Sequence, residues 1–310
     1  MCIFPETVGG GVSIEKIFFL ESPDEREYEE IKNIAENEIK DLEDFVLIVV
    51  SKSGQTAETL ETFNKTYKIL SQTFQVSKAA FDTLDERVII ISTKDSPLWQ
   101  IAEEKNIQKI EWEGNIGGRF SAFTIAHTTV LSIAGLNVEE FKKGSHYAEA
   151  SRDEQEKLAQ KIFDNYKSGV NILDFFIFNS ELEDLGKWCR QLIAESLAVI
   201  TPTVSIGPTD LHSMLELYLG GPKNRFTIFI LSLKENQNNI NQIAFENVTE
   251  AYQKNGLPFI KYEIEKINEK ELGSFMAFMM ATTIELAELL EVNPYDQPNV
   301  ENYKESLHNS

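Results

Sequence analysis

The most restrictive feature of this 310-residue chain is an unbroken apolar run, residues 45–50, followed directly by the hydroxyl-rich segment 51–59. An apolar run of this length is typical of a strand buried on both faces, and such strands occur in parallel sheets covered by helices. The residues after it have a helical pattern. The sequence therefore predicts an α/β chain in which a polar turn lies at the carboxyl end of a buried parallel strand.

The polar turn after this strand carries three hydroxyls, from Ser51, Ser53 and Thr56, together with Lys52 and Gly54. Where such a turn opens a helix, free backbone N–H groups and the positive end of the helix dipole attract an anion. The pattern differs from the nucleotide P-loop, which needs Gly-x-x-x-x-Gly-Lys-Ser/Thr. It favours a phosphate ester as the ligand, and an ordinary strand-to-helix turn with an N-cap is the alternative.

Composition limits which classes of partner the protein can bind and in which cellular compartment we expect it. The net charge of −21 argues against a nucleic-acid or anionic-membrane surface, so an anionic ligand needs a local cluster of positive groups. Cys2 and Cys189 are too few for a disulfide framework, and no Cys/His cluster has metal-ligand spacing. No apolar window reaches about 18 residues and no leader precedes a cleavage site. We expect a cytoplasmic protein with no nucleic-acid partner, membrane partner or metal.

Strand and helix patterns alternate along the chain, which predicts α/β layers with mostly parallel sheets. Strands are predicted at 17–20, 45–50, 88–92, 109–112, 175–178, 225–231 and 259–264. Helices are predicted at 24–40, 57–72, 97–104, 120–134, 182–197, 210–219, 238–255 and 269–291, and the helix at 120–134 is expected to be buried nearly all round. A charged, Gln-rich stretch at 150–167 separates two similar halves. We therefore predict domains at 1–150 and 151–292, followed by a C-terminal segment, 293–310.

Two groups of residues in this pattern are candidates for catalysis or ligand binding. Gly117, Gly118 and Arg119 lie between a predicted strand and helix, where the glycines allow close backbone approach and the arginine supplies a fixed positive charge. The alternative is a tight turn with a solvated arginine. Gln191 and Glu195 share one face near the end of an apolar helix, where burial would raise the carboxyl pKa and suit a base. The alternative is a solvated glutamate.

Two further segments carry titratable groups. His212 lies at a predicted helix start, where a histidine tends to stay neutral and so can transfer a proton near neutral pH. A histidine of a capping region is the alternative. The segment 293–304, which contains Gln297 and Lys304, has two prolines and an aromatic residue. This composition suggests an ordered segment, and the alternative is a tail.

In this order, five motifs resemble the glucose-6-phosphate isomerase family in its bacterial form. The matching stretches are 51–59, 117–121, 191–196, 209–213 and 293–304. The resemblance implies two sugar-isomerase (SIS) domains, each a three-layer α/β/α sandwich with a mostly parallel sheet, and a C-terminal segment that returns to the active site. It also implies the interconversion of glucose 6-phosphate and fructose 6-phosphate, a step of glycolysis and gluconeogenesis, without a metal or an organic cofactor.

The resemblance assigns substrate-binding roles to residues of both halves. The phosphate would be held by Ser51, Ser53 and Thr56, with Lys52 nearby. Gly118 would contact the substrate through the close backbone approach of its turn. Two glutamines, Gln191 and Gln297, would position substrate hydroxyls.

The resemblance also assigns the catalytic roles. Glu195 would be the base that moves a proton between C1 and C2 through a cis-enediolate, and Arg119 would stabilise the negative charge of that intermediate. His212, with Lys304, would open the sugar ring by proton transfer at the ring oxygen. In this family the histidine comes from the partner subunit, so the resemblance implies a homodimer.

The chain departs from the family pattern at three places. The family has a Gly-Gly-Ser turn after a first strand, whereas this chain has only Val-Gly-Gly-Gly-Val at 8–12. The resemblance thus implies that the N-terminal part of the first domain is missing. The Glu-Ser pair that begins at Glu195 is normally followed by Gly-Lys and a longer loop, but residues 197–199 are Leu-Ala-Val. Asn299 stands where the C-terminal motif usually has glycine.

Two other functions fit parts of the pattern. A dual phosphoglucose/phosphomannose isomerase would use the same site and also accept the C2 epimer. A non-catalytic sugar-phosphate-binding protein would need the phosphate turn only. Such a sensor has no need for the combination of Glu195, Arg119, His212 and Lys304.

Overall fold

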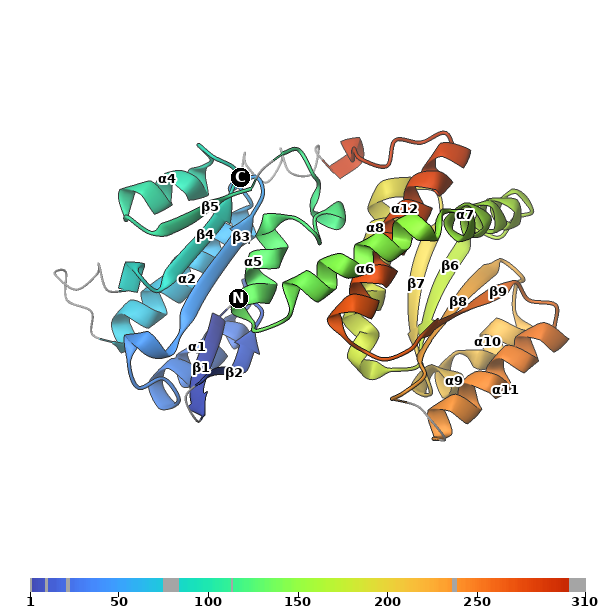
Figure 1. Ribbon diagram of the computed structural model, residues 1–310, viewed down its shortest axis with the longest axis horizontal. Coiled ribbons are helices and arrows are strands. Elements are labelled where there is room, and N and C mark those ends of the chain that lie inside the picture. The colour runs from blue at the N-terminus through green and yellow to red at the C-terminus, as the bar shows by residue number, and fades with distance from the viewer. Residues whose placement is uncertain are drawn as a thin grey trace. The chain divides into compact units, whose positions relative to one another are not determined.

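The computed structural model describes residues 2–8, 11–20, 23–74, 84–112, 114–235 and 239–300. The chain divides into two compact units, which contain Met1–Asn137 and Val138–Asn299, and each has its own sheet (Figure 1). The division falls before the boundary predicted near residue 150. The charged stretch at that boundary forms helix α7 (Arg152–Lys167), and one face of that helix is buried.

The sheet of the first unit has the order β2-β1-β3-β4-β5 among the described strands. Its strands are β1 (Cys2–Val8), β2 (Gly11–Phe18), β3 (Val46–Ser51), β4 (Val88–Ser92) and β5 (Gln108–Glu111). The last three are parallel, with Ser51 opposite Ser92. The first two form an antiparallel pair, which the sequence did not indicate beyond residues 17–20. Within the glycine-rich stretch 8–12, Gly9 and Gly10 lie outside the described residues.

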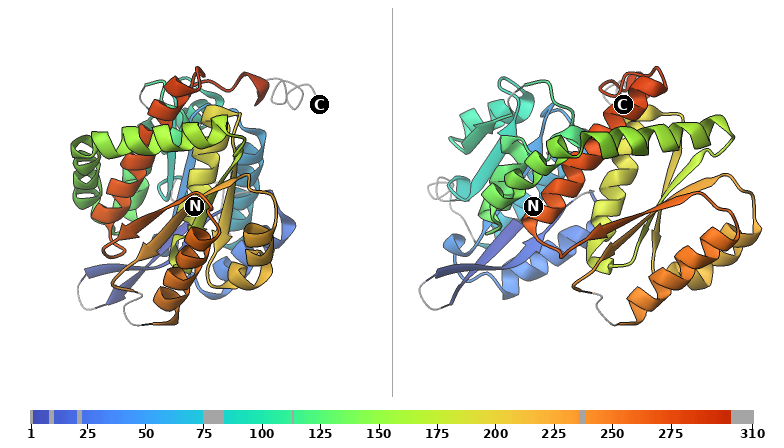
Figure 2. Two further views of the ribbon diagram at one scale, coloured as in Figure 1. Left: turned by 90° about the vertical axis from the view of Figure 1, so that its right-hand side faces the viewer. Right: turned by 45° about the vertical axis from the view of Figure 1, so that its right-hand side comes forward.

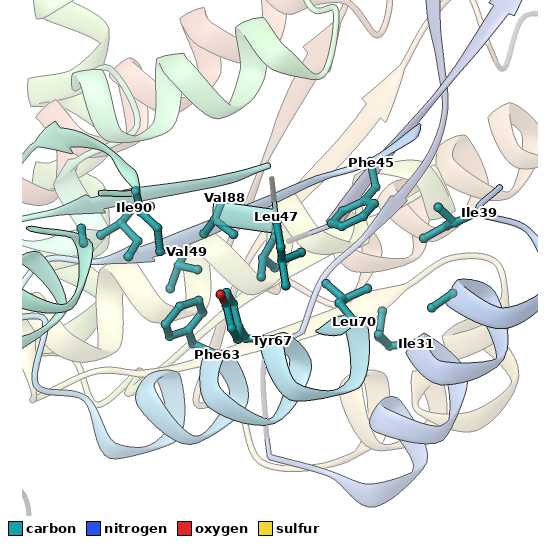
Figure 3. Close-up of a cluster of buried hydrophobic side chains, with 14 of the residues drawn as sticks. Ile31, Ile39, Phe45, Leu47, Val49, Phe63, Tyr67, Leu70, Val88 and Ile90 are labelled. Atoms are coloured by element: carbon teal, nitrogen blue, oxygen red, sulfur yellow. The ribbon is translucent and has the colours of Figure 1, made fainter. Parts of the chain in front are cut away.

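Helices cover both faces of this sheet. Helices α1 (Glu25–Asn37), α2 (Ala57–Thr73) and α4 (Pro97–Glu104) share one hydrophobic core with the inward side chains of β3 and β4. Figure 3 shows Leu47 and Val49 of β3 pointing toward Phe63 and Tyr67 of α2. On the other face, Ile48 packs in a cluster with residues of α5 (Ile125–Ile133).

Helix α5 differs from the helix predicted at 120–134. It begins at Ile125, after a separate 3-10 turn at Gly118–Phe120. Its buried residues are Ala126 and Thr128, so the expectation of burial nearly all round is wrong. The physical reason is that α5 covers the sheet with one face only, although nearly all of its side chains are apolar or small.

The sheet of the second unit has the order β7-β6-β8-β9 and is parallel throughout the described strands. Its strands are β6 (Ile172–Ile177), β7 (Thr201–Ile206), β8 (Arg225–Ser232) and β9 (Phe259–Ile264). The sequence pattern missed β7, which contains Pro202. Proline cannot donate a ladder hydrogen bond and is tolerated on an edge strand, which is where β7 lies.

The second unit is also a three-layer sandwich. One face of its sheet forms an aromatic core with α10 (Leu215–Gly220) and α11 (Ile240–Lys254). The helix predicted at 210–219 is divided in two, because a separate α9 (Thr209–Ser213) ends where the backbone turns at Met214. The opposite face carries α8 (Glu183–Leu197) and α12 (Glu269–Leu289). The fold class predicted from the alternation of strands and helices is confirmed.

Helix α12 crosses α6 (Val138–Ala150) at very close range (Figure 2). A Cβ placed on Gly273 would lie 2.1 Å from the carbonyl oxygen of Phe141, and one on Gly144 would lie 2.2 Å from that of Lys270. Glycine at both positions therefore lets the two backbones meet. Among the described helices α12 is also long and apolar enough to cross a membrane, but half of its most apolar window is buried inside this packing.

We predict that Gly273→Ala lowers the free energy of unfolding by about 1–3 kcal/mol, because the added methyl group overpacks the contact with α6. Chemical denaturation followed by circular dichroism measures this change. Gly220→Ala is the matched control, since a Cβ there would meet only Glu216 Oε1 at 3.6 Å. Equal stability of the two variants would contradict the tight helix crossing.

Candidate active site

The phosphate turn predicted after β3 is formed at the carboxyl end of that strand. Ser51 Oγ accepts a hydrogen bond from the backbone N–H of Gly54 at 3.1 Å. The Thr56 hydroxyl lies 3.4 Å from those of both Ser51 and Ser53. Ser53 and Thr56 are exposed, and the Thr56 side chain makes no capping bond at the start of α2. The hydroxyls of the exposed Ser53 and Thr56 thus lie at a helix N-terminus with the buried Ser51 beside them, an arrangement that suits an anion.

Glycine is required inside this turn. Gly54 has φ of 61°, and a Cβ there would lie 2.4 Å from Ser96 Oγ and 2.8 Å from Ser92 Oγ. The Ser92 and Ser96 hydroxyls are themselves 2.8 Å apart and buried. The turn therefore packs directly on the carboxyl end of the neighbouring strand β4, which holds it in one conformation.

A side-chain hydrogen bond joins the phosphate turn to the second predicted motif. Lys52 Nζ donates to Asn115 Oδ1 at 2.9 Å, across 63 residues of sequence. Asn115 begins the loop that leads to Gly118 and Arg119. The Arg119 side chain is only 3% exposed, so the alternative of a solvated arginine is wrong. The structure thus brings a buried guanidinium and the phosphate turn onto connected loops of one unit.

His127 of α5 supports the turn that carries Arg119, a role that the sequence did not indicate. The Ser121 hydroxyl donates to the carbonyl oxygen of Gly118 at 2.6 Å and lies 3.1 Å from Nδ1 of His127. Since its one proton is used on Gly118, the hydroxyl accepts from Nδ1–H of neutral His127. Burial lowers the pKa of His127 below its ordinary value, which keeps the ring neutral.

In the second unit, the predicted pair on α8 is formed. Gln191 Nε2 donates to Glu195 Oε1 at 2.9 Å. Glu195 is half-buried, and its helix neighbours Leu192 and Ser196 are buried. The carboxylate is therefore oriented in part by an amide of the same helix.

The end of α8 is the second place where the chain departs from the family pattern. Ala198 caps the helix in the left-handed region, with φ of 55°. A residue with a Cβ is disfavoured in this conformation, whereas glycine adopts it freely. The family pattern has Gly-Lys after the Glu-Ser pair, and here alanine takes up the turn. The backbone after Glu195 therefore adopts the left-handed conformation that favours glycine, although the residue there is alanine.

His212 is exposed on the short helix α9, which follows β7. Helix α8 runs back across the sheet and ends just before β7 begins, so Glu195 lies near the amino end of that strand. His212 lies beyond its carboxyl end. Six strand residues at about 3.3 Å each separate them by roughly 20 Å. Glu195 and His212 of one chain are thus at opposite edges of the same sheet.

The C-terminal segment is described through Val300. Asn293 organises a turn, because its Oδ1 accepts from the Tyr295 backbone and its Nδ2 donates to Asp296 Oδ2, each at 3.1 Å. Gln297 follows and is half-buried. Lys304 lies outside the described residues. Within the part of the chain that is described, no cluster of three or more His, Cys, Asp or Glu side chains is arranged to hold a metal ion.

Comparisons with known proteins agree with the resemblance seen in the motifs. No protein-family model matches the chain. The probable glucose-6-phosphate isomerase of Methanococcus maripaludis is 27% identical over 95% of this chain and 71% of its own length. The glucose-6-phosphate isomerase of Mycoplasma capricolum is 28% identical over 85% of this chain and 69% of its own length. The predicted resemblance to this family is confirmed by curated homologues that carry its name.

Solved structures share the fold. A hypothetical protein from Thermus thermophilus has a TM-score of 0.80 and 23% identity, covering 91% of this chain and 74% of that chain. A glucose-6-phosphate isomerase from Chlamydia trachomatis has a TM-score of 0.71 and 19% identity, covering 88% of this chain and 60% of that chain. These similarities confirm the predicted α/β fold.

We predict that Gly54→Ala lowers the free energy of unfolding by more than about 1–2 kcal/mol, which is the cost of a left-handed alanine by itself. The extra loss comes from the contacts with Ser92 and Ser96. Thermal denaturation measures it. Gly256→Ala is the control, because Gly256 has φ of 63° with no neighbour within 4 Å. An equal loss in both variants would show that the turn does not pack on β4 as described.

We also predict a pH dependence from His127. Because its pKa is lowered in the folded chain, the unfolded chain binds the proton more readily. The free energy of unfolding should therefore fall as the pH drops below about 6.5, by at most about 1.4 kcal/mol per pH unit from this group. His127→Gln should reduce the fall, measured by urea denaturation between pH 7.5 and pH 5, roughly the range of histidine titration. His146→Gln, at an exposed position, should leave it unchanged.

Proposed function

We propose that this homologue of the glucose-6-phosphate isomerases interconverts glucose 6-phosphate and fructose 6-phosphate. The observation that carries the proposal is the similarity to curated proteins of that name over as much as 95% of the chain. The hydroxyl-rich turn after β3, the buried Arg119 and the half-buried Glu195 would supply the groups that the reaction needs. We infer a cytoplasmic enzyme of glycolysis and gluconeogenesis.

The phosphate group would bind in the cradle at the end of β3. The hydroxyls of Ser51, Ser53 and Thr56 would donate to its oxygens, and the start of α2 would favour its charge. Lys52, held by Asn115, would add a positive charge at the edge of the cradle. With a net charge of −21 on the chain, these local groups must attract the anionic substrate against the overall field.

The proton transfer would be performed by Glu195. A carboxylate placed beside C1 and C2 takes a proton from one carbon and returns it to the other on the same face. Gln191 would keep one carboxylate oxygen in place, and Gln297 would bind a substrate hydroxyl. The guanidinium of Arg119, supported by the turn at Gly118, would stabilise the enediolate, because buried preorganised charge acts strongly on a developing anion.

Ring opening would need His212 from a second copy of the chain. Within one chain Glu195 and His212 lie at opposite edges of the second sheet, so one site cannot use both from the same sheet. A homodimer in which each His212 reaches the partner's site resolves this geometry. Lys304 would assist the proton transfer at the ring oxygen.

The direct test is an assay with fructose 6-phosphate, coupled to NADP reduction by glucose-6-phosphate dehydrogenase. We expect NADPH to form when the full chain is present and not when it is left out. No signal from folded protein, together with retained binding of fructose 6-phosphate, would favour a sugar-phosphate-binding protein instead. A second assay with mannose 6-phosphate identifies a dual isomerase.

Glu195→Gln should lower kcat by about 10²–10⁴-fold, because the amide cannot accept the proton. Binding of fructose 6-phosphate, measured by calorimetry, should persist. Glu183→Gln in the first turn of the same helix is the matched control and should keep full activity. If Glu195→Gln retained turnover, the base would have to be another residue.

A mixing experiment tests the exchange of His212 between subunits. Glu195→Gln and His212→Ala should each be inactive alone, and a mixture that is unfolded and refolded should regain about one quarter of wild-type activity. Half of the dimers are then mixed, and each mixed dimer has one intact site. If His212 acted within its own chain, no mixed dimer would contain an intact site and activity would stay at the level of the variants.

A further inference from the structure

The second unit contains a buried ion pair that the proposed reaction does not use. Asp174 of β6 is 0% exposed, and Nη1 of Arg225, at the start of β8, lies 3.2 Å from its Oδ1. Thr203 of β7 joins the two, because its hydroxyl accepts from Arg225 Nη1 at 2.8 Å and donates to Asp174. Asp174 shares a face of the sheet with Phe176, which packs in the aromatic core. The polar cluster thus lies on the face that α10 and α11 cover.

The ion pair contributes little stability by itself. Burial raises the pKa of Asp174, while the hydrogen bond from Thr203 and the charge of Arg225 lower it. When two charges leave water, the loss of their hydration offsets most of their attraction, and apolar side chains of similar volume often stabilise a core as well. The pair is therefore better explained by the group that it orients.

A chain of hydrogen bonds runs from this carboxylate to helix α10. Ser205 Oγ lies 3.1 Å from each carboxylate oxygen of Asp174 and 2.8 Å from the hydroxyl of Tyr218. Since the one proton of Ser205 is used on the carboxylate, Tyr218 donates to Ser205. The guanidinium of Arg225 lies 4.1 Å from the centre of the Tyr218 ring, within the range of a cation–π contact. Both the ring and the hydroxyl of this tyrosine are therefore held. We call Asp174, Ser205, Tyr218 and Arg225 the α10 anchor.

The segment that carries His212 depends on contacts of this kind. Helices α9 and α10 have 5 and 6 residues, and helices so short are not stable in water by themselves. Asp210 attaches α9 to β7, because its Oδ2 accepts from the backbone N–H of Ile206 at 2.7 Å. Tyr218 attaches α10 to the same strand through Ser205. His212 is exposed between these two attachments.

We propose that the α10 anchor positions His212, so that its ring is presented in one orientation to the active site of the partner subunit. The inference rests on the proposed function, because ring opening by His212 is part of it. The anchor residues would not touch the substrate. They would act through the placement of α10, and α9 follows because Met214 alone joins the two helices. A fixed position matters, since a group that transfers a proton has to lie within hydrogen-bonding distance of its target. A role in stability alone is the alternative.

The test removes one oxygen atom from the α10 anchor. Tyr218→Phe deletes the hydrogen bond to the strand and keeps the ring beside Arg225. Tyr252→Phe is the matched control, because Tyr252 is 1% exposed in the same aromatic core but belongs to α11. Its hydroxyl lies 3.5 Å from Thr227 Oγ1, outside the anchor. Ser205→Ala breaks the same link from the strand and replaces Tyr218→Phe if circular dichroism shows that variant to be unfolded.

Two measurements on the protein without substrate follow the position of His212. The chain has 4 histidines, and the ring Cε1–H signal of His212 is identified in NMR spectra by its loss in His212→Ala. Tyr218→Phe should shift this signal and speed amide hydrogen exchange in residues 209–220 by about three- to tenfold, the effect of one lost buried hydrogen bond. Tyr252→Phe should leave both unchanged. The signal of the exposed His146 should not move in either variant.

Activity separates the positioning of His212 from a general structural effect. In the fructose 6-phosphate assay, Tyr218→Phe should lower kcat about tenfold and leave KM within about twofold, because a displaced proton-transfer group loses much of its effect. Tyr252→Phe should keep the wild-type kcat. Refolding Tyr218→Phe together with Glu195→Gln should restore about one quarter of wild-type activity, since the second chain supplies a correctly placed His212. Refolding it with His212→Ala should give no such gain.

The proposal is wrong if the His212 signal and the exchange rates are the same in Tyr218→Phe and in the wild type, or if Tyr252→Phe changes them equally. It is also wrong if His212→Ala restores the activity of Tyr218→Phe and Glu195→Gln does not, because the defect would then affect the site of the same chain. If the wild-type chain showed no turnover, the proposed function would fail. The NMR and exchange measurements would still decide whether the α10 anchor positions His212.

Discussion

The parallel pairing of β3 with β4 is the interaction on which the candidate site depends. Its register places Ser51 beside Ser92, so that the phosphate turn ends against the Ser92–Ser96 pair and Gly54 fits between them. The apolar side chains of β3 are held between α2 and α5, which fixes the strand end in space. A shift of one residue would turn every one of these side chains to the opposite face.

Polar contacts then connect this strand end to the rest of the first unit. Lys52 reaches Asn115, while His127 and Ser121 hold the carbonyl group of Gly118. Arg119 is buried in the same turn, and its charge is therefore kept in one place. Preorganisation of this kind matters for catalysis because the charge does not have to be reoriented as an anion develops.

The second unit contributes a different constraint, which is the direction of α8. The helix returns antiparallel to the strands, so Glu195 is delivered to the amino edge of the sheet while His212 follows the carboxyl edge. In a parallel sheet the loops that follow the strands all lie at the carboxyl edge, and the helices return the chain to the amino edge. This arrangement gathers the loops of the first unit at one edge, and in the second unit it separates Glu195 from His212. The proposed homodimer would bring Glu195 of one chain and His212 of the other into one site.

The sequence by itself determined the α/β alternation, most strand and helix positions and the hydroxyl-rich turn after β3, because each depends on residues that are close along the chain. Only the tertiary structure decided that Arg119 is buried, that His127 supports its turn, and that β7 occupies an edge. It also decided that one face of α7 is buried. These features depend on contacts between distant segments, such as the 63 residues between Lys52 and Asn115, which no local pattern encodes.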